Sequence, residues 1–284
     1  MYTLRIIREL SKSGIVTLVL ISVFAGFLIG KPLDQSIHIP RLLLTLIGLL
    51  LLSCGASALN QIQEINRDAL MPRTAKRPLP SGRISLFAAI AFSVFTIIFG
   101  LLALAAIDPL LLGLGLTAVI LYNGFYTLWW KAHFAHAAVP GAIPGAIPIY
   151  IGYLAARAYQ PLHIHSLFLP GAIYLFLILF FWQMPHFWVL ALHYSKDYAL
   201  GGIPTLPVSY GPKRTIRQIA IWALCYMSLA LMAPLFIPGS KLYLAIPMDL
   251  ILLVELIRYW RGGKWIRFFM WVNVSLIIFL LGLW

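Results

Sequence analysis

Long apolar runs follow one another along this chain, and they constrain its fold more than any other feature. Nine of them, each of roughly 17–24 residues, are long enough to cross a ~30 Å hydrocarbon core. They lie at about 14–30, 40–59, 84–107, 109–129, 137–155, 166–185, 219–236, 242–257 and 266–283. Apolar residues make up 62% of the chain and charged residues 10%, a balance that a soluble domain of this length could not bury. We therefore predict an all-α polytopic membrane protein, a bundle of nine transmembrane helices forming one domain over residues 1–284.

The basic residues predict the orientation of this bundle. If nine segments span the membrane, all but four of the 21 Lys and Arg residues fall on the side of the N-terminus. The exceptions are Lys31, Arg41, Arg157 and Lys241. Cytoplasmic loops carry an excess of Lys and Arg, so we expect the N-terminus to lie in the cytoplasm and Trp284 to lie outside. Basic loops facing the anionic lipid bilayer account for the net charge of +13, and no motif indicates nucleic acid binding.

The second apolar run continues into a polar stripe. Asn60, Glu64 and Asp68 are spaced i, i+4, i+8, so on a helix their oxygen-bearing side chains share one face. Pro72 then ends the helix, and a cationic segment that includes Arg73 and Arg77 follows. Oxygen ligands beside guanidinium groups suit Mg²⁺ and a polyphosphate. The alternative is a cytoplasmic loop with solvated charge pairs.

A second polar segment is expected in the long loop at about 183–217. His186 and His193 are seven residues apart and would share a helical face, and Asp197 follows four residues later. An interfacial helix with an aromatic belt would explain the neighbouring Trp and Phe residues. It explains less well two histidines and a carboxylate at the mouth of a bundle, where ionisable groups are usually functional.

The loop after the fourth apolar run carries Tyr126 and Lys131. A Tyr hydroxyl and a Lys ammonium could together hold a phosphate, although a single lysine at a helix end more commonly extends to the interface. Residues 140–152 combine small residues at four-residue spacing with three prolines. Such spacing allows helices to approach closely, and we interpret this segment as the wall of a cavity.

Taken together, these motifs resemble the UbiA superfamily of intramembrane prenyltransferases. The matching blocks are Asn60-x-x-x-Glu64-x-x-x-Asp68, Met71-x-Arg73-Thr-x-x-Arg77-Pro-Leu, Tyr126-Thr-x-Trp-x-Lys131, Gly141-x-x-x-Gly145-Ala-x-Pro148, Trp182-x-x-Pro185-His186-Phe187-Trp188 and Asp197-Tyr198-x-x-x-Gly202-Ile-Pro204-x-Leu-Pro207. They occur in family order over nearly the whole chain. The last two blocks are similar to the branch of the superfamily that farnesylates haem.

The resemblance implies a UbiA-type bundle with a central cavity that faces the cytoplasm. It implies a Mg²⁺-dependent transferase that moves a farnesyl group from farnesyl diphosphate to a vinyl group of haem B, giving haem O. It also implies association with proteins of haem A synthesis or terminal oxidase assembly. The implied roles are Mg²⁺–diphosphate binding and catalysis for Asn60, Glu64, Asp68 and Asp197, diphosphate binding for Arg73, Arg77, Tyr126 and Lys131, and porphyrin binding for His186 or His193.

The chain departs from the pattern of this branch at three positions. Glu64 and Asn66 stand where Asp is usual, and Thr205 stands where Met is common. Gly201 occupies a position that carries a second carboxylate in quinone-pathway relatives, which favours the haem branch. Two alternatives remain at this point: a UbiA-type enzyme acting on a quinone precursor or another aromatic acceptor, and a membrane transporter. Transporters place ionisable groups near mid-membrane, whereas here the middles of the apolar runs are nearly free of charge.

Overall fold

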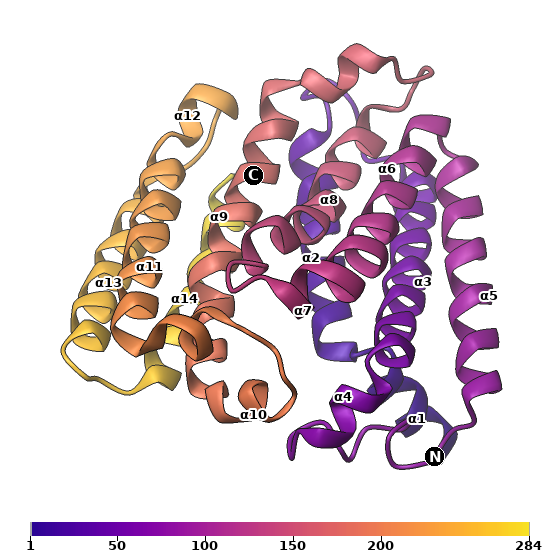
Figure 1. The fold of residues 1–284 in the computed structure, drawn as a ribbon. Helices are drawn as coiled ribbons and strands as arrows, with labels where there is room; N and C mark the ends of the chain where they lie inside the picture. Colours follow the sequence, from indigo (N-terminus) through magenta and orange to yellow (C-terminus); the bar gives the residue numbers. More distant parts are fainter. Residues whose placement is uncertain (1, 284) are drawn as a thin grey trace.

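The computed structural model describes residues 2–283, and every regular element in that range is a helix (Figure 1). The predicted position of Trp284 concerns a residue outside the described range. The elements are α1 (Tyr2–Leu10), α2 (Ser13–Gly30), α3 (Ile39–Gln63), α4 (Ile65–Leu70), α5 (Leu86–Ala105), α6 (Pro109–Val119), the π-helix η1 (Ile120–Trp130), α7 (Lys131–His133), α8 (Ala138–Arg157), the 3₁₀-helix η2 (Ile164–Phe168), α9 (Pro170–His193), α10 (Ser195–Leu200), α11 (Leu206–Leu231), α12 (Ala233–Phe236), α13 (Leu242–Trp260) and α14 (Trp265–Gly282).

Seven membrane-spanning segments are long and apolar enough to cross a bilayer within the described residues. They are α2, α3, α5, the continuous segment from α6 to α7, α8, α9 and α14. The chain is therefore an integral membrane protein. Helices α11 and α13 occupy the predicted seventh and eighth spans, but Arg214 and Arg217 in α11 and Asp249 and Glu255 in α13 make them less apolar. The count of nine spans stays a prediction.

Helix α8 lies at the centre of the bundle. In its most apolar stretch of 18 residues, 72% of the residues are buried, against 22% in α5 and 22% in the segment that begins with α6. It packs against α2, α6 and α9 (Figure 1). The small residues of α8 permit these contacts, because they let neighbouring backbones approach closely. A Cβ atom added at Gly152 would lie 2.3 Å from the carbonyl oxygen of Val23, and one added at Gly26 would lie 2.2 Å from that of Ile149.

Helix α9 is longer than its apolar run predicts. It continues to His193, and Pro185 lies inside it. The segment expected to begin the loop at 183–217 is therefore helical up to residue 193. Apolar residues continue through this stretch and pack inside the bundle, so its helical backbone is stabilised by side-chain burial as well as by local hydrogen bonds.

Two long helices each break at a single residue and are followed by a short helix. Helix α3 ends at Gln63, Glu64 has non-helical torsions, and α4 follows. Helix α9 ends at His193, Tyr194 is the break, and α10 follows. Figure 1 shows α1, α4 and α10 gathered at one end of the bundle. The expected continuous stripe from Asn60 to Asp68 is thus divided between two helices.

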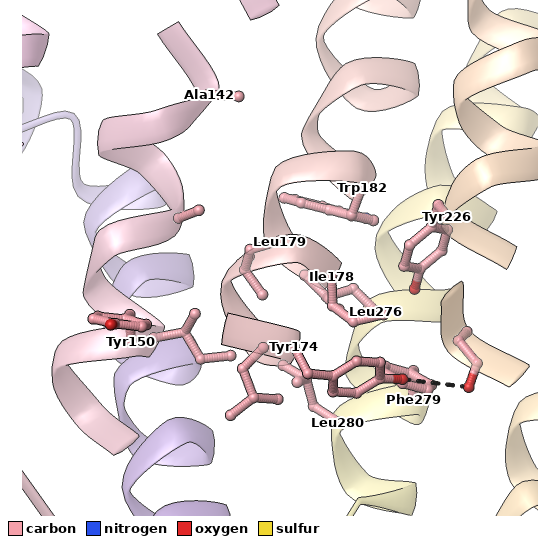
Figure 2. Packing of buried hydrophobic residues seen from close by; sticks show 14 of the residues in the cluster. Ala142, Tyr150, Tyr174, Ile178, Leu179, Trp182, Tyr226, Leu276, Phe279 and Leu280 are labelled. Carbon is pink, nitrogen blue, oxygen red and sulfur yellow. Dashed lines mark hydrogen bonds between the residues drawn. The ribbon is translucent and has the colours of Figure 1, made fainter. Parts of the chain in front are cut away.

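Away from that end, α9 packs against α11 and α14 through large aromatic side chains (Figure 2). Tyr174 donates a hydrogen bond to the carbonyl of Leu229 at 2.9 Å, and Trp182 donates one to the carbonyl of Val272 at 2.7 Å. Both side chains are buried, so these bonds satisfy polar atoms that would otherwise be costly in an apolar interior.

The contact between α2 and α8 can be tested by adding single methyl groups. We expect Gly26→Ala to destabilise the protein by about 1–3 kcal/mol, because the methyl group must displace the backbone of α8. Thermal unfolding in detergent would measure the loss. Gly113→Ala is the matched control, since a Cβ there meets nothing within 4 Å. Equal melting temperatures for the two variants would contradict the close packing.

Candidate active site

A cavity of about 420 Å³ extends from the end of the bundle where α4 and α10 lie into its interior. Its ionisable and amide side chains include Lys12, Asn60, Glu64, Asp68, Arg73, Arg77, Lys131 and Gln183. Its apolar lining includes Leu49, Leu52, Val119, Ile147, Ile151 and Phe187. A cavity with a charged mouth and an apolar interior suits an amphiphile with an anionic head and a hydrocarbon tail.

The three residues of the predicted stripe meet at the mouth of this cavity. Asn60, Glu64 and Asp68 are each at most 3% exposed. Asn60 donates a hydrogen bond from Nδ2 to Glu64 Oε2 at 3.0 Å and another to Thr127 at 3.0 Å. The break at Glu64 therefore does not separate the stripe, and its oxygen atoms remain on one wall.

Glu64 is paired with a lysine from a different part of the chain. Lys131 Nζ lies 2.6 Å from Oε1 and 2.7 Å from Oε2 of Glu64. Burial acts to raise the pKa of Glu64, but Lys131, Lys12 and Asn60 outweigh it and hold that pKa below its ordinary value. Glu64 is therefore an anion at neutral pH, although it is almost completely buried.

Asp68 is paired with an arginine from the turns that follow α4. Arg77 Nη1 lies 2.6 Å from Asp68 Oδ2. Thr74 donates a hydrogen bond to the backbone carbonyl of Asp68 at 2.8 Å, which folds the segment back over the helix. Prolines at 72 and 78 disfavour a regular helix in this segment, and the structure accordingly has a succession of turns there.

Arg73 joins the two broken helices. Its Nε lies 4.0 Å from Asp197 Oδ2, and its backbone N–H donates to the same oxygen at 3.4 Å. Its guanidinium also lies over the rings of Tyr194 and Tyr198, at 4.8 and 5.9 Å. Arg73 and Tyr198 line the cavity, whereas Asp197 is not among its lining residues. Asp197 thus contacts the site through Arg73.

The π-helix η1 contributes another wall. Tyr122 and Tyr126 stack with their ring centroids 6.0 Å apart, and both line the cavity together with Lys131. The ring of Tyr126 lies against α8, where a Cβ at Gly141 would be 2.5 Å from it. One turn further along α8, the side-chain amide of Gln183 lies against Gly145. Its oxygen is 2.0 Å from the position that a Cβ at Gly145 would take.

The two predicted histidines lie in different environments. His186 lines the cavity, with its ring 4.8 Å from those of Trp182 and Phe269. His193 is exposed, stacks on Trp265 at 3.9 Å and is not among the lining residues. Both rings nevertheless pack against α14, on Phe269 and Trp265, so the two histidines share a face of α9 as their spacing predicts. Asp197 lies beyond the break at Tyr194, in α10.

Lys12 is a cavity residue that the sequence did not reveal. The sequence placed it only among the basic residues on the side of the N-terminus. It sits between α1 and α2 with a positive φ of 52°, lines the cavity and donates a hydrogen bond to Asn60 Oδ1. Burial, and then the charges of Arg77 and Lys131, lower the pKa of Lys12 to about 7. Its place directly before the first apolar run carried no specific signal.

The oxygen donors fit a Mg²⁺ ion that reaches the site with a phosphate-bearing ligand. Among the described residues, no group of three or more His, Cys, Asp and Glu could hold a metal by itself. Mg²⁺ is commonly bound by one or two carboxylates while substrate phosphates supply further ligands. Glu64 and Asp68, with the amide oxygen of Asn60, offer such a partial set.

The sequence signature of the UbiA prenyltransferase family matches residues 19–276, and the chain belongs to this family. A protoheme IX farnesyltransferase from Bdellovibrio bacteriovorus is 44% identical over 98% of this chain and 94% of its own length. Proteins of the same name from Bacillus pumilus and Leptospira biflexa are 35% and 34% identical, over 81% and 90% of this chain and 72% and 86% of their own lengths.

Solved structures show the same fold. A UbiA homologue from Aeropyrum pernix superposes with a TM-score of 0.77 at 18% identity, covering 94% of this chain and 96% of its own. A UbiA homologue from Archaeoglobus fulgidus bound to GPP and Mg²⁺ gives a TM-score of 0.65 at 15% identity, covering 98% of this chain and 99% of its own. At these identities the likeness concerns the fold alone.

The Glu64–Lys131 pair can be tested by removing one partner and then both. We expect Lys131→Met to destabilise the protein by about 3–5 kcal/mol, because it leaves a buried carboxylate without its cation. Glu64→Gln/Lys131→Met should recover most of that loss in denaturation measurements at neutral pH.

The pH dependence supplies a control. The lowered pKa of Glu64 means that the pair stabilises the protein above the ordinary pKa of glutamate, and this contribution is lost as the pH falls through the folded-state pKa. The penalty of Lys131→Met should therefore shrink on acidification. A penalty that is the same at all pH values would show that Lys131 contributes packing and not charge.

Proposed function

We propose that this protein is a Mg²⁺-dependent farnesyltransferase that transfers the farnesyl group of farnesyl diphosphate to a vinyl group of haem B. Water completes the addition, so that farnesyl diphosphate, haem B and water give haem O and pyrophosphate. The observation that carries the proposal is a cavity whose paired carboxylates and cations lie at its mouth and whose interior is apolar. The 44% identity to a protoheme IX farnesyltransferase supports the choice of acceptor.

The charged mouth would bind and activate the diphosphate. Mg²⁺, when bound, neutralises the negative charge that develops on the departing pyrophosphate. Asn60, Glu64 and Asp68 would hold it through their oxygens. Arg77 and Lys131 would turn from their carboxylates towards phosphate oxygens, where a planar guanidinium and an ammonium stabilise the leaving group.

The second broken helix would close the same site. Arg73 would bind a phosphate oxygen, and Asp197 would hold Arg73 in place or reach the metal once the ligand is present. The hydroxyl of Tyr126 would donate a hydrogen bond to the diphosphate. Each of these roles requires a movement of side chains that lie at the mouth already.

The apolar interior would protect the reactive carbon. Ionisation of the allylic diphosphate leaves a cation that water would quench, so the cavity must exclude water around the farnesyl chain.

Of the two histidines, we assign porphyrin binding to His186, which lines the cavity. Gly201 packs beside the side chain of Met71 and supplies no second carboxylate of the kind found at this position in quinone-pathway relatives. This argues against the quinone branch.

The proposal includes an orientation. The mouth of the cavity would face the cytoplasm of a bacterial cell, with α1 inside and the chain crossing its cytoplasmic membrane nine times. Basic residues cluster in α1, in and after α4, and in the first half of α11, in agreement with the bias of cytoplasmic loops. Contacts with enzymes of haem A synthesis or oxidase assembly remain part of this proposal.

Pyrophosphate release distinguishes the acceptors. Purified protein in lipid nanodiscs should release pyrophosphate from farnesyl diphosphate when haem B and Mg²⁺ are both supplied, and should stop when EDTA removes the metal. Release with 4-hydroxybenzoate or another aromatic acid in place of haem B would instead support the quinone-type alternative. Absence of release with every acceptor would overturn the assignment as a prenyltransferase.

Arg77→Lys tests the diphosphate clamp. Lysine can keep the ion pair with Asp68 but cannot reproduce the planar fork of donors. A lost charge-assisted hydrogen bond costs about 1.5–3 kcal/mol, so kcat/KM for farnesyl diphosphate should fall roughly ten- to a hundredfold. Arg261→Lys, at an exposed position in the turn after α13, is the control. Near-wild-type kcat/KM for Arg77→Lys would leave Arg77 with only a structural role.

A further inference from the structure

A second cavity, of about 590 Å³, lies beside α1 and is more open than the first. Its lining includes Arg5, Arg8, Glu9, Lys12 and Arg77; we call it the basic chamber. It shares Lys12, Ile15 and Arg77 with the first cavity, which has the apolar interior and which we call the apolar cavity. The two cavities therefore meet at the two cations that also contact the predicted stripe.

The basic chamber has an excess of positive charge. Arg5, Arg8 and Glu9 share one face of α1 by their i, i+3, i+4 spacing, and Lys12 follows in the turn after the helix ends. Glu9 is the single carboxylate in the lining, and it is already paired with Arg5 at 3.0 Å and with Arg83 at 2.5 Å. Arg8 forms no ion pair with any described residue. Its guanidinium is available to an anion from solution.

Helix α1 is fixed on the bundle by its apolar faces. Ile6 and Leu10 are buried, and Leu10 packs with Ala58 of α3. Leu4 and Ile7 are 67% and 38% exposed on another face, as expected of a helix that lies in a membrane interface. The basic stripe is thereby held beside the mouth of the apolar cavity and not left on a free terminus.

We propose that the basic chamber binds pyrophosphate and is the port through which the diphosphate group passes between the cytosol and the active site. This inference rests on the proposed function for its biological meaning. Lys12 and Arg77 would contact the anion from both cavities, so a pyrophosphate leaving the mouth would exchange one set of cations for the next. Arg8 and Arg5 would then hold it before release.

The connection between the cavities favours pyrophosphate over the phosphate of a lipid headgroup. A headgroup site needs only a basic surface in the interface, and it does not need a wall in common with the catalytic cavity. A multiply charged anion, in contrast, gains from several guanidinium and ammonium groups placed around one space.

Direct binding of pyrophosphate tests the chamber without requiring any transfer reaction. Binding can be measured by equilibrium dialysis of labelled pyrophosphate against protein in neutral phosphatidylcholine nanodiscs. EDTA in the buffer removes the Mg²⁺-dependent contribution of the carboxylate stripe. We expect Arg5→Gln/Arg8→Gln to weaken binding at least about tenfold. Lys76→Gln/Lys196→Gln is the control, because it removes the same charge from exposed positions that line neither cavity, and its affinity should stay within about threefold of wild type.

Additional variants and membranes separate a pyrophosphate site from a lipid site and from a loss of folding. Arg5→Lys/Arg8→Lys should retain most of the affinity, and all variants should have wild-type melting temperatures. The Arg5→Gln/Arg8→Gln protein should also be compared with wild type in nanodiscs that contain phosphatidylglycerol. If the variant binds less of this anionic lipid but keeps its affinity for pyrophosphate, the chamber is a lipid site and the proposal is overturned. Unchanged pyrophosphate binding in a folded Arg5→Gln/Arg8→Gln protein would overturn it as well. If binding behaves as expected but haem B is not farnesylated, the chamber stands and the proposed acceptor fails.

Discussion

The pairing of buried carboxylates with cations from distant parts of the chain is the interaction on which the site depends. A carboxylate as buried as Glu64 or Asp68 would be very costly without a partner. Lys131 and Arg77 remove that cost, and in doing so they bring the end of η1 and the turns after α4 to the same wall. An arriving diphosphate with its metal ion would exchange partners with both pairs at once, so the site can be charged and still stable before substrate binds.

Two segments with the same local arrangement meet at this end of the bundle. In each of them a long apolar helix breaks at one residue, Glu64 or Tyr194, and a six-residue helix with an aspartate follows. Arg73 contacts the second segment from the first. Each aspartate follows the break and not the long apolar helix before it, so polar groups collect at this end of the bundle while the long helices remain apolar.

Much of this could be predicted from the sequence, and the failures have physical causes. The i, i+4, i+8 spacing of the stripe was sufficient to predict which residues meet, because a break of one residue at Glu64 changes their direction only slightly. Hydropathy placed the end of α9 too early, since a helix can extend beyond the apolar window when its side chains still pack. His186 and His193 share a face of α9, but only His186 lies deep enough to line the cavity, which their spacing alone could not tell. Lys12 was missed because a lysine before an apolar run is ordinary in membrane proteins.

The π-helical form of η1 has a consequence for how such a segment can evolve. At 3.6 residues per turn, positions nine apart, such as Tyr122 and Lys131, would lie on opposite sides of a helix. The wider i→i+5 turns of a π-helix allow both to line one cavity, together with Tyr126. A deletion within 120–130 that restored α-helical geometry would rotate Lys131 towards lipid and leave Glu64 alone. The length of this segment is therefore under a constraint as strict as the identity of its residues, and insertions or deletions should be rarer here than substitutions.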